Sequence, residues 1–568
     1  MFLALGLSMV VIIAFYLLVP TQVPTGARKG EEKKVEQPAG PGAAAAPAAP
    51  AGFTPAPTLP AAAAPVPAGR TITVETPLYT ALVDTRGGKV TGFKLKHYLL
   101  EKHNIDWAEV IPALRQWIPR ERVNPTLQVE MVRRRAEGED LLGLQFQGDD
   151  AATGAFRTAD FAPSAESVTL PDAKAAPVTL TLTASGPGGL TVRKLITFHP
   201  DSYVLGYETQ AINYGQTARP LRLLTWFGWG PDVPRDTGRG SGHQGPMYRE
   251  EGKIRKKDAE DIEDKLLIKE PQWLAVSDHY FISAATALDP GSLGVYQTET
   301  LPPGAKKSKE TLAAFGLEEQ AVNLDPQKMV SAKYKLYLGP KGTVEMGAFG
   351  AKLDESLDLT FEFLASPMLA LLRWLYSFVG NYGVAIILLT VIVRLVLFPL
   401  TYKGMVSMKR MQKLQPKIAA MKERHKNDKE RQNKEMMEMY RRYKMNPLGG
   451  CLPIILQIPI FFALYSALLG AIELRHTPFV LWITDLSAHD GLYIGPLLMG
   501  ATMFAQQKLT PSSLDPMQAK VMLWMPVVFT AFMFNFPSGL VLYWFTSNLL
   551  SIAQQMIINR VKVPDLAE

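Results

Sequence analysis

The sequence has a single cysteine, Cys451, among 568 residues, so no intramolecular disulfide can form. A domain exported to an oxidising compartment would have to be stabilised by its core alone. The sequence also has no His-x-x-x-His or His-Glu-x-x-His metal motif and no Gly-x-x-x-x-Gly-Lys phosphate loop. We therefore predict a protein that is not an enzyme, needs no cofactor or metal, and consumes no nucleotide.

Hydrophobic residues make up 47% of the chain, but they concentrate in its first 20 residues and after about residue 365. The run at 1–19 is long enough to cross a bilayer, so we expect a transmembrane anchor, with a cleaved signal peptide as the alternative. Residues 21–69 are rich in Ala and Pro and should form an extended linker.

Beyond this linker, residues 70–345 alternate short apolar runs with turns. The runs at 71–75, 178–183, 190–198 and 203–209 have period two and are rich in Thr, Val and Tyr, which is typical of β-strands. We predict a large antiparallel β-sandwich. Such a domain could bind a sugar or a peptide, so an anchored periplasmic glycan-binding protein is one alternative function.

The net charge of +7 is concentrated in one segment. Residues 401–446 contain 14 Lys and Arg against 5 Asp and Glu, and their 3-4 spaced apolar residues predict a helical hairpin. A short loop this basic belongs on the cytoplasmic side of a membrane, so specific recognition of nucleic acid is not needed to explain the charge. Methionines here could contact varied apolar partners, or they could only hold the two helices together. The candidates are Met408, Met411, Met421, Met436 and Met439.

One apolar run precedes the hairpin and four follow it. The loop at 471–490 has a net charge of −2, whereas Lys508 and Lys520 flank the next loop. With the hairpin inside, alternation places the 471–490 loop and the β-domain outside and both termini in the cytoplasm. We predict an α-helical polytopic membrane protein with six spans and a large periplasmic β-sandwich domain. The expected parts are an anchor at 1–20, a linker at 21–69, the β-domain at 70–345, an interfacial amphipathic helix at 354–377, spans at 378–400, 452–470, 492–507, 521–536 and 538–558, the hairpin at 401–446 and a tail at 559–568.

Arg394 interrupts the apolar run at 378–400. A guanidinium within a bilayer costs a few kcal/mol or more, which favours a functional role. Arg394 lies five residues before Pro399, or roughly 7 Å of helix rise, so snorkelling to the headgroups is the alternative. No clear Asp or Glu lies in the spans to neutralise it. We therefore expect a hydrated cavity around Arg394.

The spans also hold many uncharged polar residues. Any one of them can bond its own backbone or join two helices, at about 0.6 kcal/mol each, but together with Arg394 they favour a wet groove. A secondary transporter is an alternative; it would show inverted repeats and an acidic coupling residue, and we see neither in the sequence. The groove candidates are Arg394, Thr390, Gln457, Gln507, Asn535, Tyr543 and Asn548.

Residues 446–465, NPLGGCLPIILQIPIFFALY, carry the strongest motif in the chain. With further motifs, they closely resemble the YidC/Oxa/Alb family of membrane protein insertases. The resemblance covers roughly residues 370–560, and the β-domain is similar to the periplasmic domain of Gram-negative members. The further motifs lie at 378–381, 392–394, 414–417, 479–487, 515–517 and 536–543.

This resemblance implies an inner-membrane insertase and folding chaperone whose five-helix core encloses a hydrophilic groove, with Arg394 as the groove arginine. Thr390 matches a groove-lining position, and Tyr543 and Trp544 stand where the best-known members have two tyrosines. The implied partners are nascent membrane proteins, the Sec translocon (SecYEG and SecDF), the lipid bilayer, and the ribosome. Because the tail after Asn559 is short and only mildly basic, ribosome contact is expected through the cytoplasmic loops.

Overall fold

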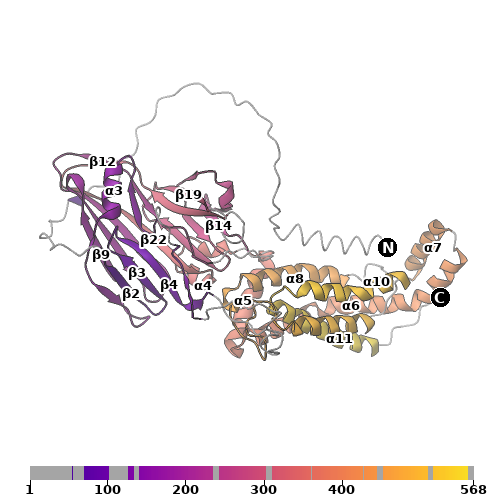
Figure 1. The fold of residues 1–568 in the computed structure, drawn as a ribbon. Helices are drawn as coiled ribbons and strands as arrows, with labels where there is room; N and C mark the ends of the chain where they lie inside the picture. Colours follow the sequence, from indigo (N-terminus) through magenta and orange to yellow (C-terminus); the bar gives the residue numbers. More distant parts are fainter. Residues whose placement is uncertain are drawn as a thin grey trace, which may run out of the picture. The chain divides into compact units, whose positions relative to one another are not determined.

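The computed structural model divides into two compact units, one of β-strands and one of helices (Figure 1). The expected anchor and most of the linker lie outside the described residues, as do residues 561–568 of the tail. The structure describes residues 54–55, 69–100, 126–133, 140–233, 242–301, 310–357, 359, 361–425, 428–443, 452–509 and 516–560.

The helical unit contains long helices and one short 3-10 turn in its described part. Among these residues, α6 is the helix that is long and apolar enough to cross a membrane, and the apolar stretches described in α8 and α10 are shorter. The helices are α5 (Glu362–Val379), α6 (Tyr382–Arg424), α7 (Lys429–Arg442), α8 (Leu452–Gly470), η6 (Ile472–Leu474), α9 (Ile494–Leu509), α10 (Pro516–Met533) and α11 (Ser538–Arg560).

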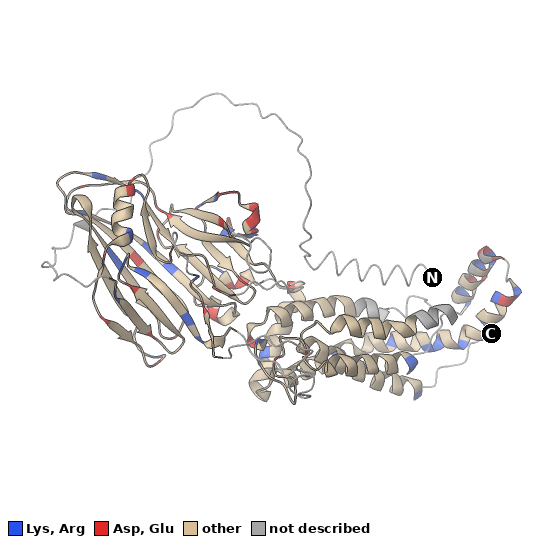
Figure 2. Ribbon diagram, in the orientation of Figure 1, with Lys and Arg blue, Asp and Glu red and all other residues tan. Residues whose placement is uncertain are grey.

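Helix α6 runs through Pro399 without a break, so most of the expected span at 378–400 and the first helix of the expected hairpin at 401–446 are one continuous helix. Pro399 removes the helical donor to the carbonyl of Leu395, four residues earlier, and the nearby Thr401 hydroxyl bonds other carbonyls of the same turn. Thr401 Oγ1 donates to the carbonyls of Leu397 and Phe398, both at 3.1 Å. The hairpin therefore consists of the second half of α6 and α7, on which Lys and Arg gather (Figure 2).

Helix α5 is separate from α6 and begins later than expected. Gly380 ends α5 in the left-handed region with φ of 64°, and the Asn381 side chain caps α6 by accepting from Val384 N. Helices α5 and α6 are therefore two separate helices. The start expected at residue 354 is wrong, because Leu353–Ser356 forms the 3-10 turn η4.

Strands of the β unit form one large sheet, two smaller sheets and a two-stranded pair among the described residues. The ten-stranded sheet has the order β15 (Lys253–Lys256), β14 (Gly245–Glu250), β17 (Trp273–Ser277), β18 (Phe281–Ala287), β22 (Lys328–Pro340), β11 (Val204–Asn213), β10 (Leu190–Phe198), β9 (Val178–Ser185), β7 (Ala162–Pro163), with β1 (Thr54–Pro55) on β22.

The two five-stranded sheets contain the remaining long strands. The pairings are antiparallel apart from β2 with β8. The first sheet has the order β16 (Lys265–Lys269), β19 (Leu293–Leu301), β20 (Glu310–Glu318), β13 (Leu223–Trp226), β6 (Gly143–Phe146). The second has the order β5 (Gln128–Glu130), β4 (Lys89–Leu99), β3 (Tyr79–Asp84), β2 (Thr71–Glu75), β8 (Ser167–Thr169). Strand β12 (Arg219–Leu221) pairs with β21 (Val322–Leu324), and the described part of this unit also contains the α-helices α3 (Asp150–Thr158) and α4 (Thr343–Gly347).

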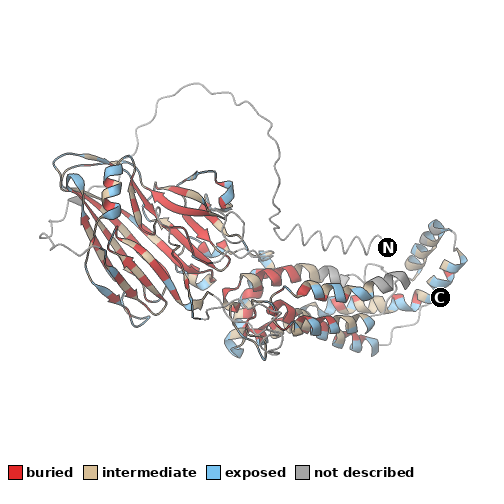
Figure 3. Cartoon of the chain, in the orientation of Figure 1, coloured by how far each residue is buried: buried red, intermediate tan, exposed pale blue. Residues whose placement is uncertain are grey.

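The expected strands are present, and period two is visible in their burial (Figure 3). Strands β2 and β10 have the expected bounds, while β9 and β11 extend beyond the predicted runs. In β3, buried and half-buried residues alternate strictly. The inward rows form the core, which includes the cluster Leu224, Trp226, Trp229, Val295, Leu312 and Ala314.

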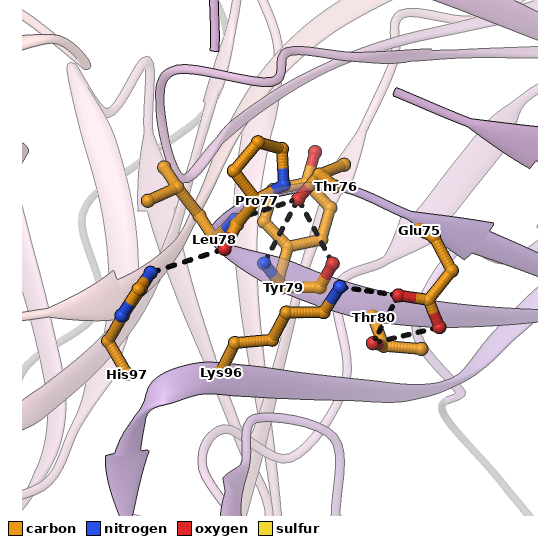
Figure 4. A network of polar contacts seen from close by, with 8 residues as sticks. All are labelled: Glu75, Thr76, Pro77, Leu78, Tyr79, Thr80, Lys96 and His97. Atoms are coloured by element: carbon orange, nitrogen blue, oxygen red, sulfur yellow. Dashed lines mark hydrogen bonds and ion pairs between the residues drawn. The ribbon is translucent and has the colours of Figure 1, made fainter. Parts of the chain in front are cut away.

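The turn between β2 and β3 shows how side chains close such a hairpin (Figure 4). Thr76 Oγ1 donates to the carbonyl of Tyr79 at 3.0 Å and accepts from the amides of Leu78 and Tyr79. Lys96 of β4 pairs with Glu75 at the end of β2. The Tyr79 ring stacks on Phe93 with centroids 4.3 Å apart, so the turn is tied to the core.

A fully buried lysine, Lys194 of β10, joins the large sheet to the smaller ones. Its ammonium donates to the carbonyls of Gly87 at 2.8 Å, Gly88 at 3.0 Å and Leu142 at 2.7 Å. In its charged form Lys194 matches three donors to three acceptors, which offsets part of the cost of burying the charge; the neutral amine keeps two donors. Gly88 has φ of 56°, and a Cβ there would lie 3.2 Å from the Lys194 Cδ, so glycine leaves room for the lysine.

We expect Lys194→Met to lower the free energy of unfolding by about 1–3 kcal/mol, because it would leave buried carbonyls without a donor. Urea unfolding of the full-length protein, followed by the circular dichroism of its β-strands, measures this. Lys253→Met, at an exposed position of β15, is the control and should change little. Equal stability of the two variants would contradict the structural role of Lys194.

The same comparison should depend on pH. Burial, aided by nearby Lys89 and opposed by Asp140, lowers the pKa of Lys194 to about 7, whereas an unfolded lysine has a pKa of about 10.4. Between these values the unfolded state binds more protons, so the stability of the native protein rises with pH. The stability difference between the native protein and Lys194→Met should therefore widen from pH 7 to pH 10, and a constant difference would argue against this shift.

Candidate functional site around Arg394

Arg394 lies on α6 where this helix packs against α11. Its side chain is half-buried, and its Nε donates to the Ser547 hydroxyl of α11 at 3.1 Å. One of its terminal nitrogens donates to the same hydroxyl oxygen. In the described helices the guanidinium thus meets a neutral group, and this contact leaves its charge uncompensated. Water or an incoming negative group would complete its solvation.

A chain of polar contacts extends from this pair to a third helix. Tyr543 lies one turn before Ser547 on α11, so the two share a face. The Tyr543 hydroxyl accepts from Gln457 Nε2 of α8 at 2.9 Å, and Tyr543 is buried. The structure therefore brings three predicted candidates, Arg394, Tyr543 and Gln457, into one network through Ser547.

Polar contacts continue along the α6–α11 seam toward the basic hairpin. Gln554 Nε2 donates to Thr401 Oγ1 at 2.9 Å. Further along, Lys409 Nζ donates to the carbonyls of Ile558 and Asn559 near the end of α11. Cations are favourable at helix C-termini, so Lys409 also stabilises the end of α11. We call the contacts of Arg394, Thr401 and Lys409 with α11 the polar seam.

Thr390 and Trp544 flank the network but make different contacts. Thr390 is one turn before Arg394, is 1% exposed, and donates to the carbonyl of Ile386 in its own helix at 2.7 Å. Trp544 packs against Phe461 of α8 and Phe529 of α10, with ring centroids 4.8 and 4.6 Å apart. Neither side chain has a described contact with the Arg394 guanidinium.

The other three groove candidates lie elsewhere. Asn548 is buried against α9, where its Nδ2 approaches Met499 O and Thr502 Oγ1 at 3.4 Å. Gln507 is half-buried near the end of α9. Asn535 is exposed in the turn before α11, and about 14 Å of helix rise separates the first residue of α11 from Ser547. The structure therefore does not bring Asn535 to the network, because α10 ends before it.

Ser547 is the residue that the sequence reasoning missed. A single serine in an apolar helix usually bonds its own backbone, so by itself it is a weak indication of a functional site. The spacing held the signal, since Tyr543, Ser547, Ser551 and Gln554 follow one another at three or four residues and share a helix face. All four side chains are buried.

The hairpin methionines divide into two groups. Met411 and Met421 of α6 are buried, which is the arrangement expected if they hold the two helices together. Met408, Met436 and Met439 are half-buried, so part of each side chain remains accessible to a partner.

Comparisons with known proteins match both units of the chain. Residues 374–565 match the family model "60Kd inner membrane protein", and residues 114–371 match the model "YidC periplasmic domain". "Membrane protein insertase YidC" of Syntrophus aciditrophicus is 39% identical over 86% of this chain and 85% of its own length. The chain belongs to the YidC family of membrane protein insertases. The insertase of Geotalea daltonii is 36% identical over 98% of both chains.

Family membership selects the insertase hypothesis over the secondary transporter and the glycan-binding protein. It also accounts for both units, since one model describes a periplasmic domain and the other an inner membrane protein. Among solved structures, a YidC insertase crystal structure with its first transmembrane domain resolved covers 86% of this chain and 94% of its own at 17% identity. Its TM-score of 0.35 is too low to support an argument about the fold.

We expect Ser547→Ala to reduce insertase activity by at least about tenfold, because a hydrogen bond to a charged group is worth about 1.5–3 kcal/mol. Insertion into proteoliposomes measures the effect, and Ser547→Thr, which keeps the hydroxyl, should restore most of it. Ser551→Ala is the matched control, since the Ser551 hydroxyl bonds only the Ser547 carbonyl among the hydrogen bonds described. Equal activity of the two alanine variants would show that the Ser547 contact is unimportant.

Proposed function

We propose that this insertase receives nascent transmembrane segments in a hydrophilic groove whose central group is Arg394. The observation that carries the proposal is a guanidinium on an apolar helix whose described hydrogen-bond partner is the neutral Ser547 hydroxyl. A polar or acidic end of a substrate would supply the missing charge or acceptors. In a medium of low dielectric this attraction is stronger than in water.

Insertion then needs no nucleotide. Once the polar end of the substrate is in the groove, a shorter hydrocarbon layer remains for it to cross. The apolar part of the substrate partitions into lipid and supplies the driving force, at about 0.8 kcal/mol per buried CH₂. Helix α9 has 16 residues, or about 24 Å of rise, and supports local thinning of a hydrocarbon core of about 30 Å.

The proposed topology has six spans with both termini in the cytoplasm and the β unit in the periplasm. The basic hairpin, from the second half of α6 through α7, would lie in the cytoplasm because short basic loops stay on that side. The 471–490 loop, with a net charge of −2, would then lie outside.

Two kinds of partner besides the substrate belong to this proposal. The charge of the hairpin suits the ribosome, whose surface is rich in phosphate, and its half-buried methionines suit apolar segments. Cooperation with the Sec translocon is proposed for clients whose insertion begins there, and independent action for short ones. In both cases the groove would receive the segment from the same side as the hairpin.

We expect Arg394→Ala to stop insertion of Sec-independent substrates, with a loss of at least about tenfold, whereas Arg394→Lys should retain part of the activity because it keeps the charge. The measurement is insertion of a short single-span client into proteoliposomes. Arg560→Ala, at an exposed position at the end of α11, is the control and should remain active. Full activity of Arg394→Ala would refute the proposed role.

Site-specific photocrosslinking tests the path of the substrate. A stalled nascent membrane protein should crosslink to probes at Arg394 and Trp544, which lie in or beside the polar network. A probe at Asn535 should give little product, because this residue lies in the turn at the far end of α11. Crosslinks of equal yield from all three positions would contradict a path confined to the groove.

A further inference from the structure

The loop between α8 and α9 presents an apolar turn at residues 479–483, here called the apolar tip. Phe479 N donates to Ile483 O at 3.0 Å, and Ile483 N donates to Val480 O at 3.2 Å, so the tip is a closed turn. Leu481 is 79% exposed and Val480 is 49% exposed. The five residues of the tip carry no charge.

The backbone of the tip makes this exposure unusual. Leu481 has φ of 56°, in the left-handed region that glycine and asparagine adopt at low cost and leucine does not. In a turn surrounded by water, a small polar residue would suit this position better. A leucine there indicates that its side chain meets an apolar environment that the described protein does not supply.

The tip is held firmly to the ends of the two neighbouring helices. On the α6 side, Asn381 Nδ2 donates to Phe479 O at 3.2 Å, and a Cβ on Gly383 would lie 2.0 Å from the Phe479 ring. On the α9 side, Trp482 Nε1 donates to Asp490 Oδ2 at 3.1 Å, and Asp490 accepts the Gly495 amide. The exposed side chains are therefore fixed in position relative to the starts of α6 and α9.

Further apolar side chains are exposed on α5 and α9, near the residues that bond the tip. Phe378 and Val379 of α5, just before Asn381, are 70% and 37% exposed. Leu497 and Leu498, one turn into α9, are 55% and 45% exposed. In a chain of an inner-membrane family, such surfaces face lipid. The residues that bond the tip, Asn381 and Asp490, lie close to these side chains in the sequence, at the end of α6 opposite the basic hairpin.

We propose that the apolar tip inserts Val480 and Leu481 among the acyl chains of the leaflet at this end of α6. The occupant of the surface is lipid, because the tip is bonded to residues at the starts of α6 and α9, close in the sequence to exposed apolar residues of α5 and α9. This inference goes beyond the proposed function and does not depend on Arg394.

A fixed anchor at this end would also decide where the membrane thins. The described helix α9 rises about 24 Å, which is less than a hydrocarbon core of about 30 Å and favours a locally thinned bilayer. With the start of α9 held at the tip, the thinning would fall on the side of the hairpin. That side is the one from which the groove is proposed to receive its substrate.

A fluorescent label tests the lipid contact. Cys451→Ser removes the single cysteine, and Leu481→Cys or Val480→Cys then takes an environment-sensitive NBD label in the full chain, reconstituted in nanodiscs. Since interfacial segments lie about 5–10 Å into the headgroup and acyl boundary, we expect lipids spin-labelled near the headgroup to quench the label roughly twofold. A label at Glu430→Cys, exposed on the hairpin, is the control and should not be quenched.

Three other outcomes would count against the proposed insertion of the tip. A label at 481 that emits as in water and is not quenched would overturn the proposal. A label that is shielded from water but not quenched would also overturn it, since protein rather than lipid would then cover the tip. Leu481→Asn keeps a residue that tolerates the left-handed backbone, and it should weaken quenching at a Val480→Cys label; unchanged quenching would show that Leu481 does not set the depth.

Discussion

The contact between the Arg394 guanidinium and the Ser547 hydroxyl is the interaction on which the function proposed for the helical unit depends. It places a charge on an apolar helix without placing a carboxylate beside it. A guanidinium paired with a carboxylate would attract a third group only weakly, because the carboxylate would already neutralise its charge. A charge met by a hydroxyl keeps its attraction for a third group, and the polar seam toward Lys409 extends polar contacts to the hairpin end of the bundle.

Each unit contains a cation that is buried or half-buried, and the two cations differ in their hydrogen bonds. Lys194 in the β unit donates to three backbone carbonyls and is fully enclosed, so it can serve stability alone. Arg394 is only half-buried, and the hydrogen bonds described for it, both to Ser547, use only part of its planar fork. The two cations differ in how many of their donors are used. Lys194 uses all three within the core, whereas Arg394, in the proposed function, has donors left for a substrate.

Depth in the membrane links the site to the rest of the helical unit. The hydrogen bonds of the apolar tip with Asn381 and Asp490 fix the starts of α6 and α9 relative to each other. Arg394 then lies at a set distance along α6, because α6 is continuous through Pro399 into the hairpin. In the proposed function, a bundle assembled this way would place a thin region of membrane, Arg394 and the basic hairpin on one side.

The sequence by itself determined the family, the division into a β unit and a helical unit, the strands of period two, and the bounds of α8, since these depend on local patterns of apolar residues and on specific motifs. It also indicated Arg394, because a charge in an apolar run stands out. Only the tertiary structure decided that Ser547 is its partner, that Asn548 serves the contact with α9 instead, and that Asn535 lies in a distant turn. The reason is physical: one helix specifies which of its residues share a face, but which face meets which neighbour depends on how all the helices pack together.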